Sequence, residues 1–373
     1  MTLPFLDLKS SYLELQSEID SAVGRVLRSG SYIGGAEVEA FEHEFGVFCG
    51  APHVVGVANG LDALKLALLA LGVGPGDEVI VPSHTFIATW LAVSQCGATP
   101  VPAEPAPGGF NINPNEVAAR ITPKTKGIIP VHLYGEPADL EPLIDIAERH
   151  KLFVLEDAAQ AHGAVYKGRR IGAHGHAVAW SFYPGKNLGA FGDGGAVSTQ
   201  SESLARRIRM LGNYGSRTKY VNDAIGYNSR LDPMQAAILR AKLPLLDEWN
   251  TRRHAIAERY NEALGTLLST PTIPAERYGH AWHLYVVRHP NRDRLQQQLA
   301  DVGITTLIHY PHPPHLQAAY AAMGLGAGSL PLAEQYAASV LSLPIGPHLT
   351  SEQVDQVIEA VKRALATHPT SHV

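Results

Sequence analysis

HVVGVANGLDALKLALLALGVGPGDEVIVP, residues 53–82, gives the clearest indication of how this chain folds. A short β-branched run, HVVGVA, precedes a segment of helical length, LDALKLALLALG, and a second β-branched run, DEVIVP, follows. Short apolar runs bounded by glycine turns are typical of buried strands, and the longer segment is typical of a helix. The stretch therefore predicts the beginning of a parallel α/β sheet.

The same alternation continues on the carboxyl side to about residue 200. The next segments are TFIATWLAVSQCG, KGIIPVHL, LEPLIDIAERH, LFVLED, VAWSF and GGAVST. They predict a mainly parallel sheet with helices on both faces, in a large domain of residues 1–247. A strand HLYVVRH and the helices RDRLQQQLADVG and SEQVDQVIEAVKRAL predict a smaller α/β domain over residues 248–373. Sheets of this kind bind ligands at the carboxyl ends of their strands.

Composition excludes several classes of function. Hydrophobic residues make up 45% of the chain and charged residues 17%, as in an ordinary globular protein. The net charge of -5 gives no surface for nucleic-acid backbones. No apolar run approaches the roughly 18 residues of a membrane helix, and the opening MTLPFLDLKSSYLEL carries acids, so we expect a cytoplasmic protein. Cys49 and Cys96 lack the paired spacing of a metal or redox site, and no H-E-x-x-H pair is present, so we expect no metal.

Asp157 is the first candidate for chemistry, because it ends the apolar strand LFVLE in the stretch LEDAAQAHGA. A carboxylate at the sheet edge could pair with the protonated nitrogen of a pyridine ring, which keeps the ring an electron sink. Taken alone, the residue is more simply explained as a helix N-cap on the turn that follows. Asp157 by itself therefore does not establish a cofactor site.

Lys186 is the second candidate, in SFYPGKNLGAFGDGGA. A Pro-Gly turn projects the lysine, and a glycine-rich return leads into another strand. A lone loop lysine is usually a solvated charge, but this one follows the strand-end aspartate by the length of one strand and hairpin.

The third candidate is ANGLDALKLALL, which offers a strand end, a glycine turn and an amphipathic helix, the arrangement that binds phosphate. Gly60 and Leu61 would supply N–H groups and Ser181 a hydroxyl, although a glycine turn before a helix is common in α/β proteins.

Together these stretches resemble the DegT/DnrJ/EryC1/StrS family of sugar aminotransferases, within the type I fold of pyridoxal-phosphate-dependent transferases. The resemblance covers nearly the whole chain. It rests on eight blocks in the family's order: FLDLKSSY, SGSYIGGAEVEAFE, ANGLDAL, PSHTFIAT, EDAAQAHGA, SFYPGKNLGAFGDGGA, GYNSRLDPMQAAIL and IHYPHPPH.

The resemblance implies a role for each matching residue. Lys186 would form the Schiff base with pyridoxal 5'-phosphate and shuttle the proton during transfer, in which the cofactor passes through its pyridoxamine phosphate form. The other cofactor contacts implied are Asp157 with the pyridinium nitrogen, Gln160 with the 3-hydroxyl, Phe86 stacked on the ring, and Gly60, Leu61 and Ser181 around the phosphate. Asn228 would reach the phosphate from a second subunit, so the family implies a homodimer with shared sites.

The family also implies the substrates. L-Glutamate is the expected donor and a nucleotide-linked keto-sugar the acceptor, contacted by Tyr183, His309 and Tyr310. SFYPGKNLG, with QAHGA upstream, is similar to members that aminate carbon 3 of a dTDP-linked 3-keto-6-deoxyhexose. Carbon 3 of a UDP-linked 2-acetamido-3-keto-glucuronate, and carbon 4 of a 4-keto nucleotide sugar, remain as alternatives.

Two further alternatives belong to other classes of protein. A non-catalytic regulatory protein could keep this fold and the cofactor, because a fold does not dictate a function. A nicotinamide-dependent oxidoreductase lacks support, since no G-x-G-x-x-G follows the first strand. In related sugar dehydratases histidine replaces the Schiff-base lysine, and the lysine found here favours aminotransfer.

Overall fold

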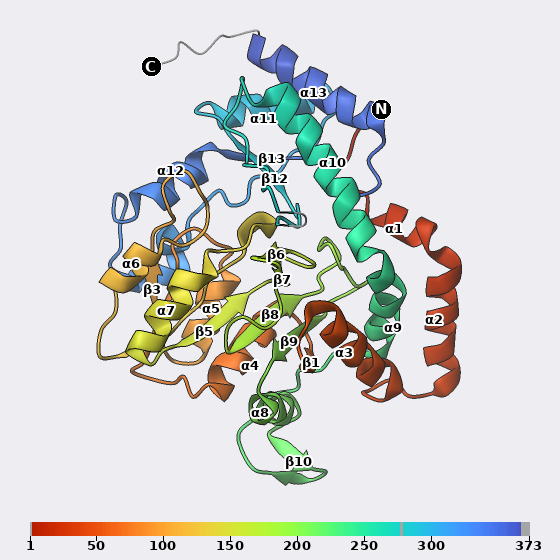
Figure 1. Ribbon diagram of the computed structural model, residues 1–373, viewed down its shortest axis with the longest axis vertical. Helices are drawn as coiled ribbons and strands as arrows, with labels where there is room; N and C mark the ends of the chain where they lie inside the picture. The colour runs from red at the N-terminus through yellow and green to blue at the C-terminus, as the bar shows by residue number, and fades with distance from the viewer. Residues whose placement is uncertain (1, 277–278, 367–373) are drawn as a thin grey trace.

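In the computed structural model, which describes residues 2–276 and 279–366, the alternating segments form one central sheet of seven strands. The strands are β1 (His53–Val57), β2 (Glu78–Pro82), β3 (Thr99–Ala103), β4 (Thr125–Ile128), β5 (Phe153–Asp157), β8 (Ala177–Ser181) and β9 (Gly195–Thr199). Their order across the sheet is β1-β9-β8-β5-β4-β2-β3 (Figure 1). Only β9 runs antiparallel to its neighbours, so the sheet is mainly parallel, as the sequence predicts.

The edge strand β3 has no counterpart among the strands expected from the sequence. Its segment TPVPA contains Pro100 and Pro102, which cannot donate to a ladder and therefore argue against a central strand. β3 pairs with β2 alone, and the edge of a sheet tolerates proline.

Helices bury both faces of the sheet, and this explains why the strands are mostly apolar. One face is covered by α4 (Gly60–Ala70), α5 (Ala88–Gln95) and α8 (Glu202–Gly212). The other face is covered by α3 (Ala36–Cys49), α6 (Pro114–Ala119), α7 (Leu140–His150) and α9 (Pro233–Lys242). Along β2 the side chains alternate between the two layers: Val79 and Val81 pack in the first, and Ile80 in the second.

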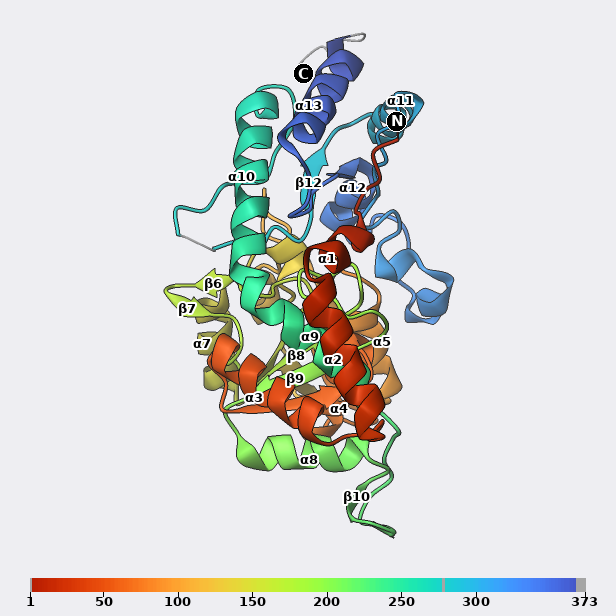
Figure 2. The ribbon, with the colours of Figure 1, turned by 90° about the vertical axis from the view of Figure 1, so that its right-hand side faces the viewer.

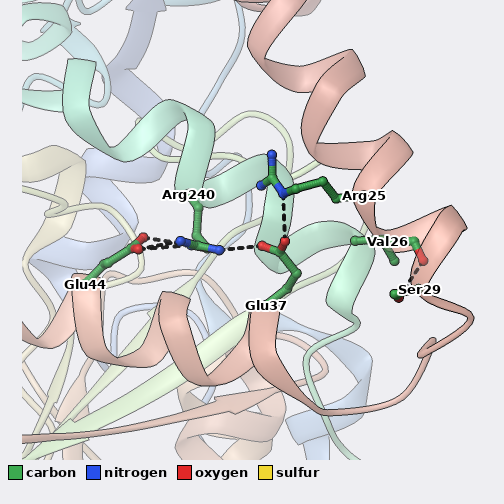
Figure 3. Close-up of polar contacts among 6 residues, drawn as sticks. All are labelled: Arg25, Val26, Ser29, Glu37, Glu44 and Arg240. Atoms are coloured by element: carbon green, nitrogen blue, oxygen red, sulfur yellow. Dashed lines mark hydrogen bonds and ion pairs between the residues drawn. The ribbon is translucent and has the colours of Figure 1, made fainter.

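The amino-terminal helices α1 (Leu8–Glu14) and α2 (Gln16–Ser29) extend the second layer, with α2 running beside α9 (Figure 2). An ion-pair network joins this layer, as Figure 3 shows. Arg240 of α9 lies between Glu37 and Glu44 of α3, at 2.6 Å from each, and Glu37 also accepts from Arg25 of α2. One arginine of α9 thus bridges two carboxylates of α3, and this holds the two helices side by side.

The carboxyl-terminal part of the chain lies at one end of the molecule (Figures 1 and 2). It comprises α10 (Leu246–Leu264), β12 (Tyr285–Arg288), α11 (Arg292–Asp301), α12 (Pro331–Ser339), β13 (Val340–Leu343) and α13 (Ser351–Ala366). β12 and β13 pair antiparallel, and α10, α11 and α13 pack with them around a separate core. Leu3 joins that core and pairs with Ile304, so the amino terminus of the chain contacts its carboxyl-terminal part.

Short elements complete the described structure. The two-residue strands β6 (Val165–Tyr166) and β7 (Arg169–Arg170) form a hairpin, and β10 (Ser216–Thr218) and β11 (Val221–Asn222) form another, which projects beyond α8 (Figure 1). Four 3-10 turns also occur: η1 (Leu133–Gly135), η2 (Leu243–Leu245), η3 (Pro314–Leu316) and η4 (Ala318–Met323). Among the described helices, none has the length and apolar character needed to cross a membrane.

The register of the sheet decides where the site forms. β1 and β8 run parallel to each other because β9 lies antiparallel between them. Gly195 of β9 pairs with both Val57 and Ser181, so the carboxyl ends of β1 and β8 lie side by side. Asp157 ends the next strand, β5, at the same edge.

Candidate active site

Asp157 is buried at the carboxyl end of β5 and is held there on both carboxylate oxygens. Thr89 of α5 donates to Oδ2 at 2.9 Å, and the Ala159 N–H donates to Oδ1 at 3.2 Å. Burial nevertheless raises the pKa of this carboxyl above its usual value, while these hydrogen bonds and the charge of Lys186 oppose the rise. A buried carboxylate of this kind favours a cationic partner, such as a protonated ring nitrogen.

Lys186 projects from the Pro-Gly turn that follows β8. Its backbone N–H donates to Tyr183 O at 2.8 Å, which closes the turn. Within the part of the chain that the structure describes, the Lys186 amine has no hydrogen-bond partner. Burial lowers its pKa to about 8, against the opposing charge of Asp157. The amine is therefore more readily neutral, and more nucleophilic, than a surface lysine.

The turn predicted to bind phosphate, called the phosphate-binding turn below, is formed by the amino end of α4 and by Ser181. Asn59 caps the helix by accepting from the Asp62 N–H at 2.8 Å. The N–H groups of Gly60 and Leu61 remain without an acceptor among the described residues. Gly60 must be glycine, because a Cβ there would lie 2.7 Å from Ser181 Cβ. Two free N–H groups at a helix amino end, beside a hydroxyl, form a site for a phosphate.

Gln160, Phe86 and Tyr310 lie together, with Tyr310 in contact with both of the others. Gln160 accepts from the Tyr134 N–H at 2.6 Å and donates to the Tyr310 hydroxyl at 3.0 Å. The ring of Phe86 is 5.3 Å from that of Tyr310, and half of its surface, 52%, is exposed. An exposed aromatic ring beside a buried amide is available to cover a flat ligand.

The three predicted substrate residues differ in their surroundings. His309 Nδ1 lies 2.8 Å from Ser342 Oγ, and burial lowers its pKa to about 4, so the ring is neutral at neutral pH. Burial raises the pKa of Tyr310, and its hydroxyl stays protonated. Tyr183 lies on the Lys186 turn with 59% of its surface exposed. The structure thus gathers His309 and Tyr310 into the site and leaves Tyr183 at its rim.

Asn228 does not join the site of its own chain. It is exposed, pairs with Asn213 and accepts from Arg230 at 2.7 Å. None of its contacts among the described residues is with Lys186, Asp157 or the phosphate-binding turn. A role in a partner's site therefore stays a prediction.

Sequence reasoning missed two residues that support the site. Thr89 holds Asp157 across a separation of 68 residues, and Tyr134 contacts both Gln160 and the carbonyl of His309. Thr89 lies in PSHTFIAT, which is recognisable in the sequence as a family motif. Only the fold shows which side chain of this motif contacts Asp157.

The arrangement fits pyridoxal 5'-phosphate. A free amine, a buried carboxyl, an exposed aromatic ring and a helix amino end without acceptors gather at one sheet edge. These are the groups that would respectively meet the aldehyde, the ring nitrogen, the ring face and the phosphate.

Comparisons with known proteins agree with this chemistry. The model of the DegT/DnrJ/EryC1/StrS aminotransferase family matches residues 13–362. The chain is 56% identical to a dTDP-3-amino-3,4,6-trideoxy-alpha-D-glucose transaminase of Streptomyces venezuelae, over 96% of this chain and 95% of that protein. It is 57% identical to the erythromycin biosynthesis sensory transduction protein EryC1 of Saccharopolyspora erythraea, over 97% of this chain and 99% of that protein.

A solved structure shares the fold closely. S. venezuelae DesV, crystallised in complex with a ketimine intermediate, superposes with a TM-score of 0.95 at 56% identity, over 97% of this chain and 98% of that one.

Proposed function

We propose, from the premise that the chain belongs to the DegT/DnrJ/EryC1/StrS aminotransferase family, that it aminates carbon 3 of a dTDP-linked 3-keto-6-deoxyhexose. The protein is a pyridoxal-phosphate-dependent aminotransferase of type I fold. The transaminase relative from Streptomyces venezuelae, whose name specifies a dTDP-3-amino sugar, supports the carbon-3 assignment.

The observation that carries the proposed chemistry is the placement of Lys186 where the charge of the buried Asp157 carboxyl acts on its amine. The amine has no protein partner among the described residues, its pKa is lowered to about 8, and the charge of the buried Asp157 carboxyl acts on it. A surface lysine needs neither feature. A lysine that attacks a carbonyl and moves protons needs both a neutral amine and a fixed place.

Each residue then has a task in the reaction. When bound, pyridoxal phosphate would supply an electron sink beside the reacting carbon. Asp157, held by Thr89 and Ala159, keeps the ring nitrogen protonated. Lys186 Nζ accepts a proton from one of the two reacting carbons and delivers it to the other. The N–H groups of Gly60 and Leu61 and the Ser181 hydroxyl hold the phosphate, and Gln160 and Phe86 orient the ring.

The remaining assignments rest on the family and the sequence. L-Glutamate is the proposed amino donor, and a homodimer with Asn228 in the partner's phosphate site is the proposed assembly. Tyr183, His309 and Tyr310 are the proposed substrate contacts. The division into domains at residues 247 and 248 is part of the same proposal.

A panel of keto-sugars tests the function. The holoenzyme is incubated with glutamate and, separately, with dTDP-linked 3-keto and 4-keto 6-deoxyhexoses and UDP-linked 2-acetamido-3-keto-glucuronate. Mass spectrometry detects the aminated product, and the Lys186→Ala variant is the control. The proposal expects the dTDP-linked 3-keto sugar to be aminated fastest. Preference for either other sugar would overturn the substrate assignment.

A regulatory role is the second candidate, because one relative is named a sensory transduction protein. A purely regulatory chain would bind cofactor and aminate none of the panel. The intact Lys186 and Asp157 argue for catalysis.

A further inference from the structure

Asn187, the residue directly after Lys186, lies at the centre of a buried network of hydrogen bonds. Its side-chain Nδ2 donates to the Ala281 carbonyl at 2.6 Å and to Asn250 Oδ1 at 2.8 Å. Asn250, on α10, donates in turn to the His162 carbonyl at 2.8 Å. Asn187 and Asn250 are only 5% and 1% exposed, so each bond forms away from water.

The backbone carbonyls of Ala281 and His162 determine which atom donates in every hydrogen bond of this network. A carbonyl oxygen can only accept, so the atom of Asn187 that faces Ala281 must be the amide nitrogen. The atom of Asn250 that faces His162 O must be its nitrogen for the same reason. Asn187 Oδ1 is then left as an acceptor, and it lies 3.2 Å from His283 Nδ1.

Because Asn187 Oδ1 can only accept, His283 must carry its proton on Nδ1, and this N–H donates the hydrogen bond to Asn187 Oδ1. Burial and the nearby charge of Lys186 both lower the pKa of His283 well below its usual value, so the ring stays neutral. Asn187 follows β8 of the central sheet, whereas Asn250, Ala281 and His283 belong to the carboxyl-terminal part. The hydrogen-bond network consequently links the Lys186 turn to the carboxyl-terminal part of the protein.

We propose, resting on the aminotransferase activity proposed above, that Asn187 and His283 are positioning residues for Lys186. The His283 Nδ1–H···Oδ1 Asn187 bond completes the anchor that holds the Lys186 turn. Lys186 Nζ must reach both the carbon that gives up the proton and the carbon that receives it, so a small shift of the turn slows transfer. Displacements of about 1 Å can cost roughly 10²-fold in rate.

Two substitutions of His283 separate the positioning bond from the rest of the ring. Asparagine keeps an N–H donor at the place of Nδ1 and removes Nε2. Leucine fills a similar volume and removes both nitrogens. We expect His283→Leu to lower kcat by about tenfold to a hundredfold while the KM for the keto-sugar stays nearly constant. His283→Asn should restore most of kcat.

A measurement on the wild-type protein without cofactor tests the bond directly. Histidine labelled with ¹⁵N reports its tautomer in long-range ¹H–¹⁵N spectra, and the His283 signals are those absent from His283→Asn. The proposal expects neutral His283 with the proton on Nδ1 at neutral pH. A proton on Nε2, or a charged ring, would overturn it, even if His283→Leu does not fold.

The kinetic outcomes are equally decisive. Wild-type kcat in His283→Leu would remove the positioning role, and equal losses in both variants would place the role on Nε2. If the wild type aminates no sugar, the proposed function fails, but the tautomer still decides whether the anchor exists.

Discussion

Lys186 is partly buried and Asp157 is buried, and burial is the main cause of the pKa shift of each. Burial lowers the pKa of the amine to about 8 and raises the pKa of the carboxyl. Both shifts disfavour charge in a site that has few partners for it, and a cationic ring nitrogen would supply the partner that Asp157 lacks. The chemistry of the site thus begins with the cost of burying these two groups.

The lowered pKa of Lys186 predicts a pH dependence of cofactor capture. Only the neutral amine attacks an aldehyde, so the rate at which cofactor-free protein captures pyridoxal phosphate should rise with pH. The midpoint should lie near pH 8, the pKa of Lys186, instead of about 10.4 for an ordinary lysine. Stopped-flow absorbance measures the rate, with Lys186→Ala as the blank. A midpoint near 10 would show that the surroundings of the amine do not lower its pKa.

Asp157→Asn should separate binding from chemistry. The amide keeps the size of the carboxyl but loses the charge that, in the proposed role, would keep the ring nitrogen protonated. We therefore expect turnover to fall by at least about 10²-fold. Cofactor should still bind, because the phosphate-binding turn is intact, and the visible spectrum verifies this. Nearly normal turnover would reduce Asp157 to a cap of the following turn.

At the level of the elements, the amino end of α4 is sensitive to a single added methyl group. In Gly60→Ala the new Cβ would lie 2.7 Å from Ser181 Cβ, and either the helix or β8 must move. We expect cofactor affinity to weaken about tenfold or more. Gly74→Ala is the matched control, because nothing lies within 4 Å of its Cβ. Equal affinities in the two variants, measured by fluorescence titration, would separate α4 from the phosphate.

Sequence predicted those elements whose signal is local. The strand ends at Asp157 and Ser181 and the turn at Lys186 follow from short apolar runs and glycine turns. β3 was missed because its two prolines oppose strand pairing everywhere except at an edge, and only the assembled sheet shows that β3 is an edge.

The contacts that support the site could not be predicted from the sequence for a related reason. Asn187 meets Asn250 across 63 residues and His283 across 96. No local pattern in one sequence pairs such residues, so the supporting contacts needed the structure, whereas the site residues themselves lie in recognisable motifs.

At the scale of the whole molecule, the exposed Asn228 predicts a site shared between two subunits. Chains with Lys186→Ala and chains with Asn228→Ala are mixed under conditions that exchange subunits. In a heterodimer one site carries both lesions and the other carries neither, so activity should return to at most about half that of a normal dimer. This requires Asn228→Ala alone to be strongly impaired. Verified heterodimers without activity would place Asn228 in its own chain's site or in none.

Borohydride reduction shows directly whether Lys186 carries the cofactor. Reduction of the holoenzyme fixes the cofactor to its lysine, and peptide mass spectrometry identifies that residue. Lys242 is an internal control: burial lowers its pKa to about 8 as well, but its amine donates to Gly189 O at 2.7 Å. We predict the phosphopyridoxyl group on Lys186 alone. Its presence on Lys242 or another lysine, or its absence from all of them, would contradict the account.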